Sequence, residues 1–290
     1  MKHKFEIPTS EALPDIRARR LFEEMARRTL IMGILNITPD SFSDGSVYFD
    51  KKAALARGLE MVEQGADIID VGGESTRPGA EPVSPEEEIR RTAPIIEQLS
   101  AASIAVSIDT YHADTARAAL DAGAIMVNDI SGLSFDQAMR GLVAERKAPA
   151  VLMHIKGTPK DMQKNPEYID LMGEICNYLR ARIVDAVNAG VDERVLIVDP
   201  GIGFGKTKEH NLEILRRLRE ITSLGRPILV GTSRKSTIGQ VLGGLPPEER
   251  VEGTAATVAI SIANGANIVR VHDVKEMARV AKMTDAIVKV

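Results

Sequence analysis

The chain has 290 residues, of which 44% are hydrophobic and 27% are charged, and its formal net charge is -4. This composition is typical of a globular protein and argues against a disordered chain. The acidic balance gives no general attraction to nucleic acid, and no apolar run approaches the length of about 18 residues that a membrane-spanning helix needs. Cys176 is the only cysteine and the start lacks the apolar core of a secretory signal, so we expect a cytoplasmic protein.

Residues 1–28 precede the first predicted strand, and we expect them to form an N-terminal extension or a cap that is partly helical. From residue 29 onward, short β-branched apolar runs alternate with longer segments that carry Ala, Leu, Glu and Arg at helical spacing. The runs are residues 29–35, 67–71, 104–108, 125–127, 150–153, 195–198, 227–231 and 267–271. The length also allows two domains, but no linker or change of composition divides the chain. The pattern predicts one α/β domain over residues 29–290, a (β/α)8 TIM barrel.

Turn and capping residues support the same architecture. Gly65, Gly123, Gly190 and Gly265 each stand where a helix would end before the next strand. The segment 84–87, Ser-Pro-Glu-Glu, is typical of a helix start with proline in the first turn.

Polar or charged residues follow each predicted strand. In chain order they are Asn36, residues 74–77, Asp109, Asn128 and Asp129, His154, Asp199, residues 233–235, and Arg270 with His272. A barrel places all eight strand ends on one face, where catalytic sites of this fold are built. A single Asp, Asn or Ser at such a position often only caps a helix or satisfies loop amides. The whole set, with charges of both signs, indicates a binding site.

One group within this set suits a planar heterocycle. Asp109, Asn128 and Asp199 end apolar strands, where an unpaired polar group costs about 1–3 kcal/mol. A ring with neighbouring N–H donors would pair with the carboxylates, and Lys235 could contact a ring carbonyl. The alternative is an internal ion pair between Lys235 and one of the two aspartates.

A second group suits an anion. Arg270 and His272 end the eighth strand, which lies beside the first strand once the barrel closes, and this corner commonly holds phosphate. Asn36 and Asp40 add oxygen atoms suited to Mg2+, the usual companion of a diphosphate. The alternative for Asn36 and Asp40 is an ordinary capped loop.

The glycine-rich run at residues 199–207, DPGIGFGKT, fails as a nucleotide phosphate loop because Pro200 occupies the position of the required first glycine. We interpret it as a tight turn that exposes Phe204 to stack on or shield a ligand.

Several blocks of the sequence together resemble the dihydropteroate synthase family. They are GILNITPDSFSDG, DVGGESTRPGA, SIDT, NDISGL, LMHIKGTPKDMQ, DPGIGFGK, GTSRKS and RVHDV. The resemblance runs from about residue 29 to the end. It implies a stand-alone bacterial-type transferase that joins 6-hydroxymethyl-7,8-dihydropterin diphosphate to p-aminobenzoate and releases 7,8-dihydropteroate and diphosphate.

The resemblance also assigns roles to residues. Asp109, Asn128, Asp199 and Lys235 match pterin-binding positions, and Asn36, Arg270 and His272 match the diphosphate site. Mg2+ would contact Asn36 directly and Asp40 indirectly. The p-aminobenzoate pocket would be formed by Phe42, Thr76, Pro78, Phe204 and Ser236, with Ser75 and Arg77 in a closing loop. Asp40, Asp109, Lys235, Arg270 and His272 are the predicted catalytic residues, and no general base is assigned because an arylamine is already a free nucleophile.

The family further implies a homodimer and competition between sulfonamides and p-aminobenzoate. Lys156 and Thr232 depart from the residues common in the family but lie outside the predicted substrate contacts. Two other functions stay open: a pterin-binding methyltransferase that acts on methyltetrahydrofolate and a corrinoid protein, and a paralogue that binds pterin without condensing it. No nucleic-acid or membrane partner is expected.

Overall fold

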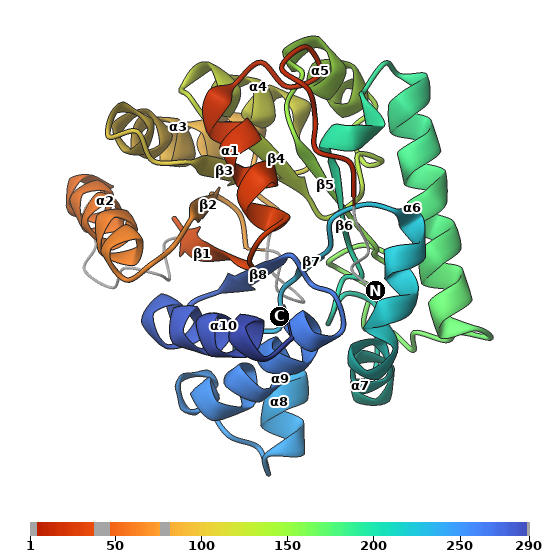
Figure 1. The fold of residues 1–290 in the computed structure, drawn as a ribbon. Coiled ribbons are helices and arrows are strands. Elements are labelled where there is room, and N and C mark those ends of the chain that lie inside the picture. Colours follow the sequence, from red (N-terminus) through yellow and green to blue (C-terminus); the bar gives the residue numbers. More distant parts are fainter. Residues whose placement is uncertain (1–4, 38–46, 76–81, 289–290) are drawn as a thin grey trace.

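The structure, a computed structural model, describes residues 5–37, 47–75 and 82–288. In this part of the chain, eight parallel strands form the centre of the molecule and helices surround them (Figure 1). The strands are β1 (Leu30–Asn36), β2 (Ile68–Gly72), β3 (Val106–Asp109), β4 (Met126–Asp129), β5 (Ala150–Met153), β6 (Leu196–Asp199), β7 (Leu229–Val230) and β8 (Ile268–Val271). Their order in the sheet is β6-β5-β4-β3-β2-β1-β8-β7.

Contacts between β6 and β7 close this sheet into a barrel. The Val198 N–H donates to the Pro227 carbonyl over 2.9 Å, and Val198 pairs with Ile228 in an isolated parallel bridge. The predicted (β/α)8 barrel is therefore confirmed. The predicted run 150–153 coincides with β5, and the other runs lie within one or two residues of their strands at each end.

The helices follow the strands in alternation. They are α1 (Ile16–Met25), α2 (Val47–Glu63), α3 (Pro85–Ala101), α4 (Ala113–Asp121), α5 (Ala138–Arg146), α6 (Leu171–Asn188), α7 (Lys208–Arg217), α8 (Ser236–Val241), α9 (Val251–Ala263) and α10 (Val274–Val288). Short 3-10 helices are η2 (Glu193–Val195), η3 (Leu218–Leu224) and η4 (Pro247–Glu249). No helix in the described ranges is both long enough and apolar enough to cross a membrane.

The predicted helix boundaries have the expected local geometry. Gly65, Gly123, Gly190 and Gly265 all have φ values between +97° and +108°, which side chains other than glycine rarely adopt. The Ser84 side chain accepts a bond from the backbone N–H of Glu87 at the start of α3. These residues end or begin helices where the sequence predicts.

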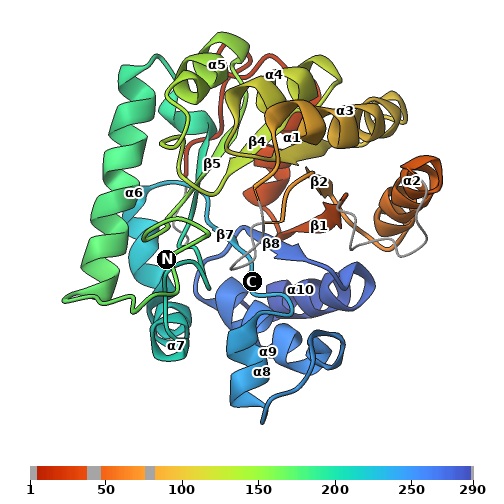
Figure 2. The same cartoon turned by 180° about the vertical axis from the view of Figure 1, so that it is seen from behind.

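The N-terminal segment packs over the end of the barrel where the strands begin. Phe22 and Met25 of α1 are buried in the main core. Arg28 forms an ion pair of 2.6 Å with Asp67, just before β2, and Arg17 donates to the Gly123 carbonyl, just before β4. In Figure 1 α1 lies in front of the strands, and in Figure 2 it lies behind them. The opposite end of the barrel is thus left for a site, while the division of the chain at residue 28 stays a prediction.

Candidate active site

The strand register aligns several of the predicted site residues. Asn36 of β1 pairs with Gly72 of β2, Gly72 pairs with Asp109 of β3, and Asp109 pairs with Asn128 of β4. All four residues lie at the carboxyl ends of their strands. The register therefore forms one row of polar groups at the mouth of the barrel.

Arg270 of β8 joins this row through two ion pairs. Its Nε donates to Asp70 Oδ2 and its Nη2 donates to Asp109 Oδ2, both over 2.6 Å. Asn128 Nδ2 donates to the same Asp70 oxygen over 2.9 Å. The sequence predicts that a ligand pairs with the carboxylates at the mouth, and Arg270 supplies part of this pairing. The Asp109 carboxylate is therefore already oriented.

Burial shapes the charges of this network. Desolvation raises the pKa of Asp109, Arg270 opposes the rise, and the neighbouring Asp70 adds to it. Burial alone would lower the pKa of Arg270, but Asp70 and Asp109 together raise it, so the guanidinium stays charged. A cation held between two carboxylates leaves the centre with an excess of acceptors, which suits a ligand rich in N–H donors.

Asp199 and Lys235 lie on the other side of the mouth. Asp199, at the end of β6, accepts the Gly201 N–H over 2.7 Å, and burial raises its pKa. The Lys235 ammonium donates to the Ile202 carbonyl and lies 4.7 Å from the centre of the Phe204 ring. Among the described residues Lys235 forms no ion pair, so the internal pair considered for it is replaced by the pairs of Arg270.

The Lys235 pKa is lowered to about 8, mainly by burial, while Asp199 limits the fall. A lysine with such a pKa changes charge near physiological pH. Asp109, whose pKa is raised to about 7, also titrates near this range.

His272 lies just after β8 and contacts the loop that carries Lys235. Its backbone N–H donates to Ser233 Oγ over 3.1 Å, and its Nδ1 lies 3.0 Å from the same oxygen. Arg234 forms an ion pair with Asp273 across the same two loops. These contacts connect the ends of β7 and β8, so the loop that carries Lys235 is tied to the predicted diphosphate side.

Oxygen donors suited to a hard cation lie at the end of β1. A Cβ atom placed on Gly72 would come 3.5 Å from Asn36 Oδ1 and 3.7 Å from Asp109 Oδ2. The absence of a side chain at Gly72 thus leaves a small space with an amide oxygen and a carboxylate oxygen beside it. Oxygen atoms are the kind of ligand that Mg2+ prefers, and Asn36 Oδ1 is the one of this pair that Arg270 does not bind.

Several predicted residues fall outside the described ranges: Asp40, Phe42, Thr76, Arg77 and Pro78. Ser75 is described and half-buried, at the start of the predicted second loop. Ser236 is exposed as the first residue of α8, directly after Lys235. Phe204 is half-buried beside Lys235, and its role as a residue that shields a ligand stays a prediction.

Two charged residues of this region were not predicted. Asp70 is fully buried inside β2, and Lys206 is 3% exposed at the end of the glycine-rich run. Lys206 Nζ lies 2.9 Å from His154 Nδ1 and donates to the Phe204 carbonyl over 2.9 Å. Burial lowers the Lys206 pKa well below its usual range and lowers that of His154 to about 2. Two sequence features could have pointed to these residues: Asp70 is a charged residue within an apolar run, and Lys206 is a charged residue next to a glycine turn.

Known proteins share the sequence pattern and the fold of this chain. The family described as "Pterin binding enzyme" matches residues 32–272. The dihydropteroate synthase of Synechocystis is 50% identical over 275 residues, which are 94% of this chain and 95% of that protein. The chain belongs to the dihydropteroate synthase family.

Solved structures of dihydropteroate synthases have the same fold. The enzyme from Clostridium difficile, solved with pteroic acid, is 48% identical with a TM-score of 0.86, over 90% of this chain and 97% of that one. The enzyme from Yersinia pestis, solved with a sulfonamide, is 42% identical with a TM-score of 0.86, over 91% and 95% of the two chains. The predictions of a dihydropteroate synthase and of a transferase are confirmed by these relatives.

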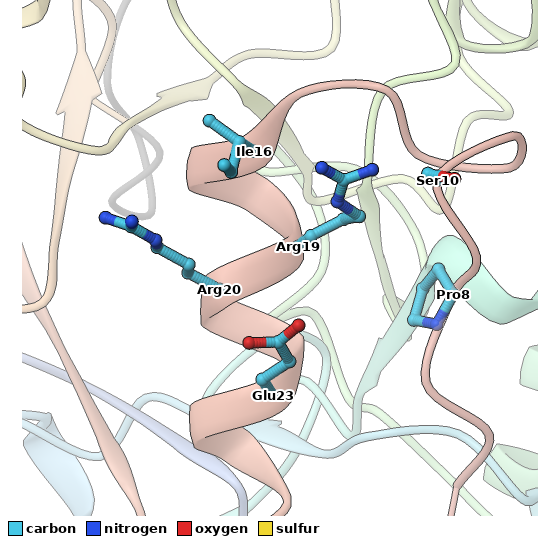
Figure 3. Close-up of a pocket in the computed structure, with 6 residues that line it drawn as sticks. All are labelled: Pro8, Ser10, Ile16, Arg19, Arg20 and Glu23. Atoms are coloured by element: carbon cyan, nitrogen blue, oxygen red, sulfur yellow. The ribbon is translucent and has the colours of Figure 1, made fainter.

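A separate pocket lies far from this synthase-type site. Figure 3 shows Ile16, Arg19, Arg20 and Glu23 of α1 with Pro8 and Ser10 of the preceding segment. Because α1 covers the end of the barrel where the strands begin, this pocket lies on the opposite side from the mouth where the strands end.

Proposed function

We propose that the chain condenses 6-hydroxymethyl-7,8-dihydropterin diphosphate with p-aminobenzoate to give 7,8-dihydropteroate and diphosphate. The observation that carries the proposal is the charged centre at the mouth, where Arg270 is held by Asp70 and Asp109 beside Asn128. Relatives at about half identity are named for this reaction. A methyltransferase or a non-catalytic paralogue finds no such support.

The pterin ring would bind between Asp109, Asn128, Asp199 and Lys235. The two carboxylates and the amide oxygen would accept the N–H donors of the ring, and the Lys235 ammonium would donate to a ring carbonyl. The low exposure of Asn128 and Asp199, 5% and 6%, supports this role because it strengthens their hydrogen bonds to a ligand.

The diphosphate would bind near Asn36, Arg270 and His272. Loss of diphosphate leaves a cationic methylene on the pterin, and the Asp109 carboxylate would stabilise that cation. Arg270 would stabilise the charge on the departing group. Asn36 would hold Mg2+ directly and Asp40 indirectly, and a bound Mg2+ would neutralise diphosphate charge.

The p-aminobenzoate would bind near Phe204 and Ser236, with Phe42, Thr76 and Pro78 completing the pocket. Its amine needs no base to attack the methylene carbon, because it is unprotonated at neutral pH. Water would compete for the same cation, so we propose that the loops at residues 38–45 and 75–80, with Ser75 and Arg77, close over the site and exclude water.

The test is to identify the product made by the purified protein from the two substrates with Mg2+. We expect a species with the mass of dihydropteroate, and an Asp199→Asn variant should form it far more slowly. A matched Asp192→Asn variant changes a half-buried aspartate whose side chain, among the described residues, pairs with its neighbour Arg194, and this variant should keep the rate. Pterin binding without this product would favour the paralogue, and methyl transfer would favour the methyltransferase.

We further propose that the protein is a cytoplasmic homodimer. Ile260 of α9 and Met283 and Ile287 of α10 are at least half exposed, and these two helices pack on each other. Large apolar side chains exposed on paired helices are candidates for a subunit interface. Light scattering should give twice the chain mass, and Met283→Lys should reduce it. A monomeric wild-type protein would contradict the proposal.

A further inference from the structure

The most unusual buried group outside the predicted substrate contacts is Asp70 in the middle of β2. It pairs in register with Ile34 and Ser107 and lies two residues before Gly72. Residues two apart in a strand point to the same face, so Asp70 lies one layer below the row formed by Asn36, Asp109 and Asn128. Its exposed fraction is 0%, whereas the Asp109 side chain is 11% exposed. A ligand at the mouth can therefore reach Asp109 but not Asp70.

One oxygen of Asp70 fixes two side chains from different strands. Oδ2 accepts from Arg270 Nε over 2.6 Å and from Asn128 Nδ2 over 2.9 Å. The other edge of the Arg270 guanidinium then faces Asp109 through Nη2. Because the guanidinium is planar, a bond at Nε and a bond at Nη2 together determine the plane in which it lies.

The same oxygen also decides which end of the Asn128 amide meets a ligand. With Nδ2 bonded to Asp70, the amide oxygen is the end that stays free of bonds within the described residues. The orientation of an amide is assigned from its hydrogen bonds, and a carboxylate partner leaves no choice. The mouth therefore presents three acceptors, from Asp109, Asn128 and Asp199, to a heterocycle that carries N–H donors.

Stability of the fold alone does not account for Asp70. Its Oδ1 is fully buried and has no hydrogen-bond partner among the described residues. A buried oxygen without a partner costs about 1–3 kcal/mol, and well-packed apolar residues often replace buried ion pairs without loss of stability. The bonds that Asp70 makes to Arg270 and Asn128 therefore point to a function in arranging these neighbours.

We propose that Asp70 is a positioning residue of the synthase site. It holds Arg270 in the plane that meets the diphosphate side and holds Asn128 with its oxygen toward the pterin, without touching either substrate. The inference rests on the proposed function, because it names the ligand as an N–H-rich pterin that carries a diphosphate.

The test is the variant Asp70→Asn, which keeps the shape of the side chain but removes its charge and lets the Asn128 amide turn. The matched control is Glu88→Gln, because Glu88 is 1% exposed and its Oε2 also accepts two bonds, from Thr110 and His112, each 3.0 Å long. Calorimetry would measure the affinity for the pterin diphosphate without p-aminobenzoate, kinetics would give KM for each substrate, and scanning calorimetry would give Tm.

We expect Asp70→Asn to weaken the affinity for the pterin diphosphate about tenfold or more, the scale of one lost charge-assisted bond. Its KM for p-aminobenzoate should stay within about twofold of wild type, as expected when only the pterin side of the site is disturbed. Glu88→Gln should lower Tm by about as much as Asp70→Asn does, yet it should keep the affinity for the pterin diphosphate.

Three results would overturn the role of Asp70: unchanged pterin affinity in Asp70→Asn, the same loss of affinity in both variants, or a failure of Asp70→Asn to fold where Glu88→Gln folds. A wild-type protein that binds the pterin diphosphate but forms no dihydropteroate would instead refute the proposed function. The comparison of binding between the variants would still decide the role of Asp70.

Discussion

Replacement of Arg270 by methionine should strongly destabilise the barrel as well as its chemistry. The change removes the cation that pairs with Asp70 and Asp109 and leaves two carboxylates, 0% and 11% exposed, without it. Loss of one partner from a buried ion pair costs about 3–5 kcal/mol. For a domain of this size each kcal/mol corresponds to about 2 °C, so we expect Tm to fall by about 6–10 °C at pH 8.

The pH dependence adds a second signature. Burial already raises the Asp109 pKa from 3.8, and Arg270 is the group that opposes the rise. Without Arg270 the pKa of Asp109 in the folded state rises further. Protonation of Asp109 then stabilises the folded state, and this contribution is complete below pH 3.8, the ordinary pKa of an aspartate. That stabilisation is lost as pH increases through the folded pKa. The Tm deficit of Arg270→Met should therefore shrink as the pH is lowered.

Arg217→Met is the matched control, measured by the same scanning calorimetry. Arg217 also pairs with two carboxylates, Glu213 and Glu220, at 2.7 and 2.6 Å, but its side chain is 42% exposed. Exposed pairs contribute about 0–1 kcal/mol, so this variant should change Tm by no more than about 2 °C. A Tm deficit for Arg270→Met as small as that of the control would refute the reasoning that Arg270 is the structural counter-ion of the site.

Three further outcomes are expected from the local geometry. The kcat/KM for the pterin diphosphate should fall above about pH 8 as Lys235 loses its proton, and Lys235→Arg should abolish this alkaline fall; a pH-rate profile that is the same in both proteins would contradict it. Gly201→Ala should cost about 2 kcal/mol or more in urea unfolding, because Gly201 has φ +68° and an added Cβ would come 1.9 Å from a backbone oxygen. Gly141→Ala, where nothing lies within 4 Å, should be neutral or stabilising by up to about 1 kcal/mol. Lys206→Met should cost about 1–3 kcal/mol in the same assay because it leaves buried acceptors without a donor, while Lys208→Met, whose ion pair is exposed, should change little. Equal effects would argue against a structural hydrogen-bond donor at Lys206.

The sequence predicts the barrel well because its signals are local. Glycines at the helix ends need positive φ, and apolar runs of strand length recur with helical segments between them. The row formed by Asn36, Asp109 and Asn128 could also be predicted, because each residue ends a strand and parallel strand ends meet on one face. Both the barrel and this row of polar residues follow from the alternation of strand and helix patterns along the chain.

The internal pairing of the site could not be predicted in the same way. The predicted run 67–71 contains Asp70, but no pattern in the sequence says that its partner is Arg270, 200 residues later. That contact depends on the closure of β8 against β1, which brings the strand-eight side chain over β2 and β3. For the same reason the sequence left an ion pair open for Lys235, whereas in the barrel Arg270 forms the ion pairs. An aspartate inside an apolar run was the one signal available.

The most direct test of the whole account is diphosphate release by the purified protein with the pterin diphosphate and Mg2+, with and without p-aminobenzoate. We expect release that depends strongly on p-aminobenzoate and that matches dihydropteroate formation mole for mole. Diphosphate release at the same rate without p-aminobenzoate, or no release while the pterin diphosphate still binds, would contradict the proposal that the site around Arg270 performs this condensation.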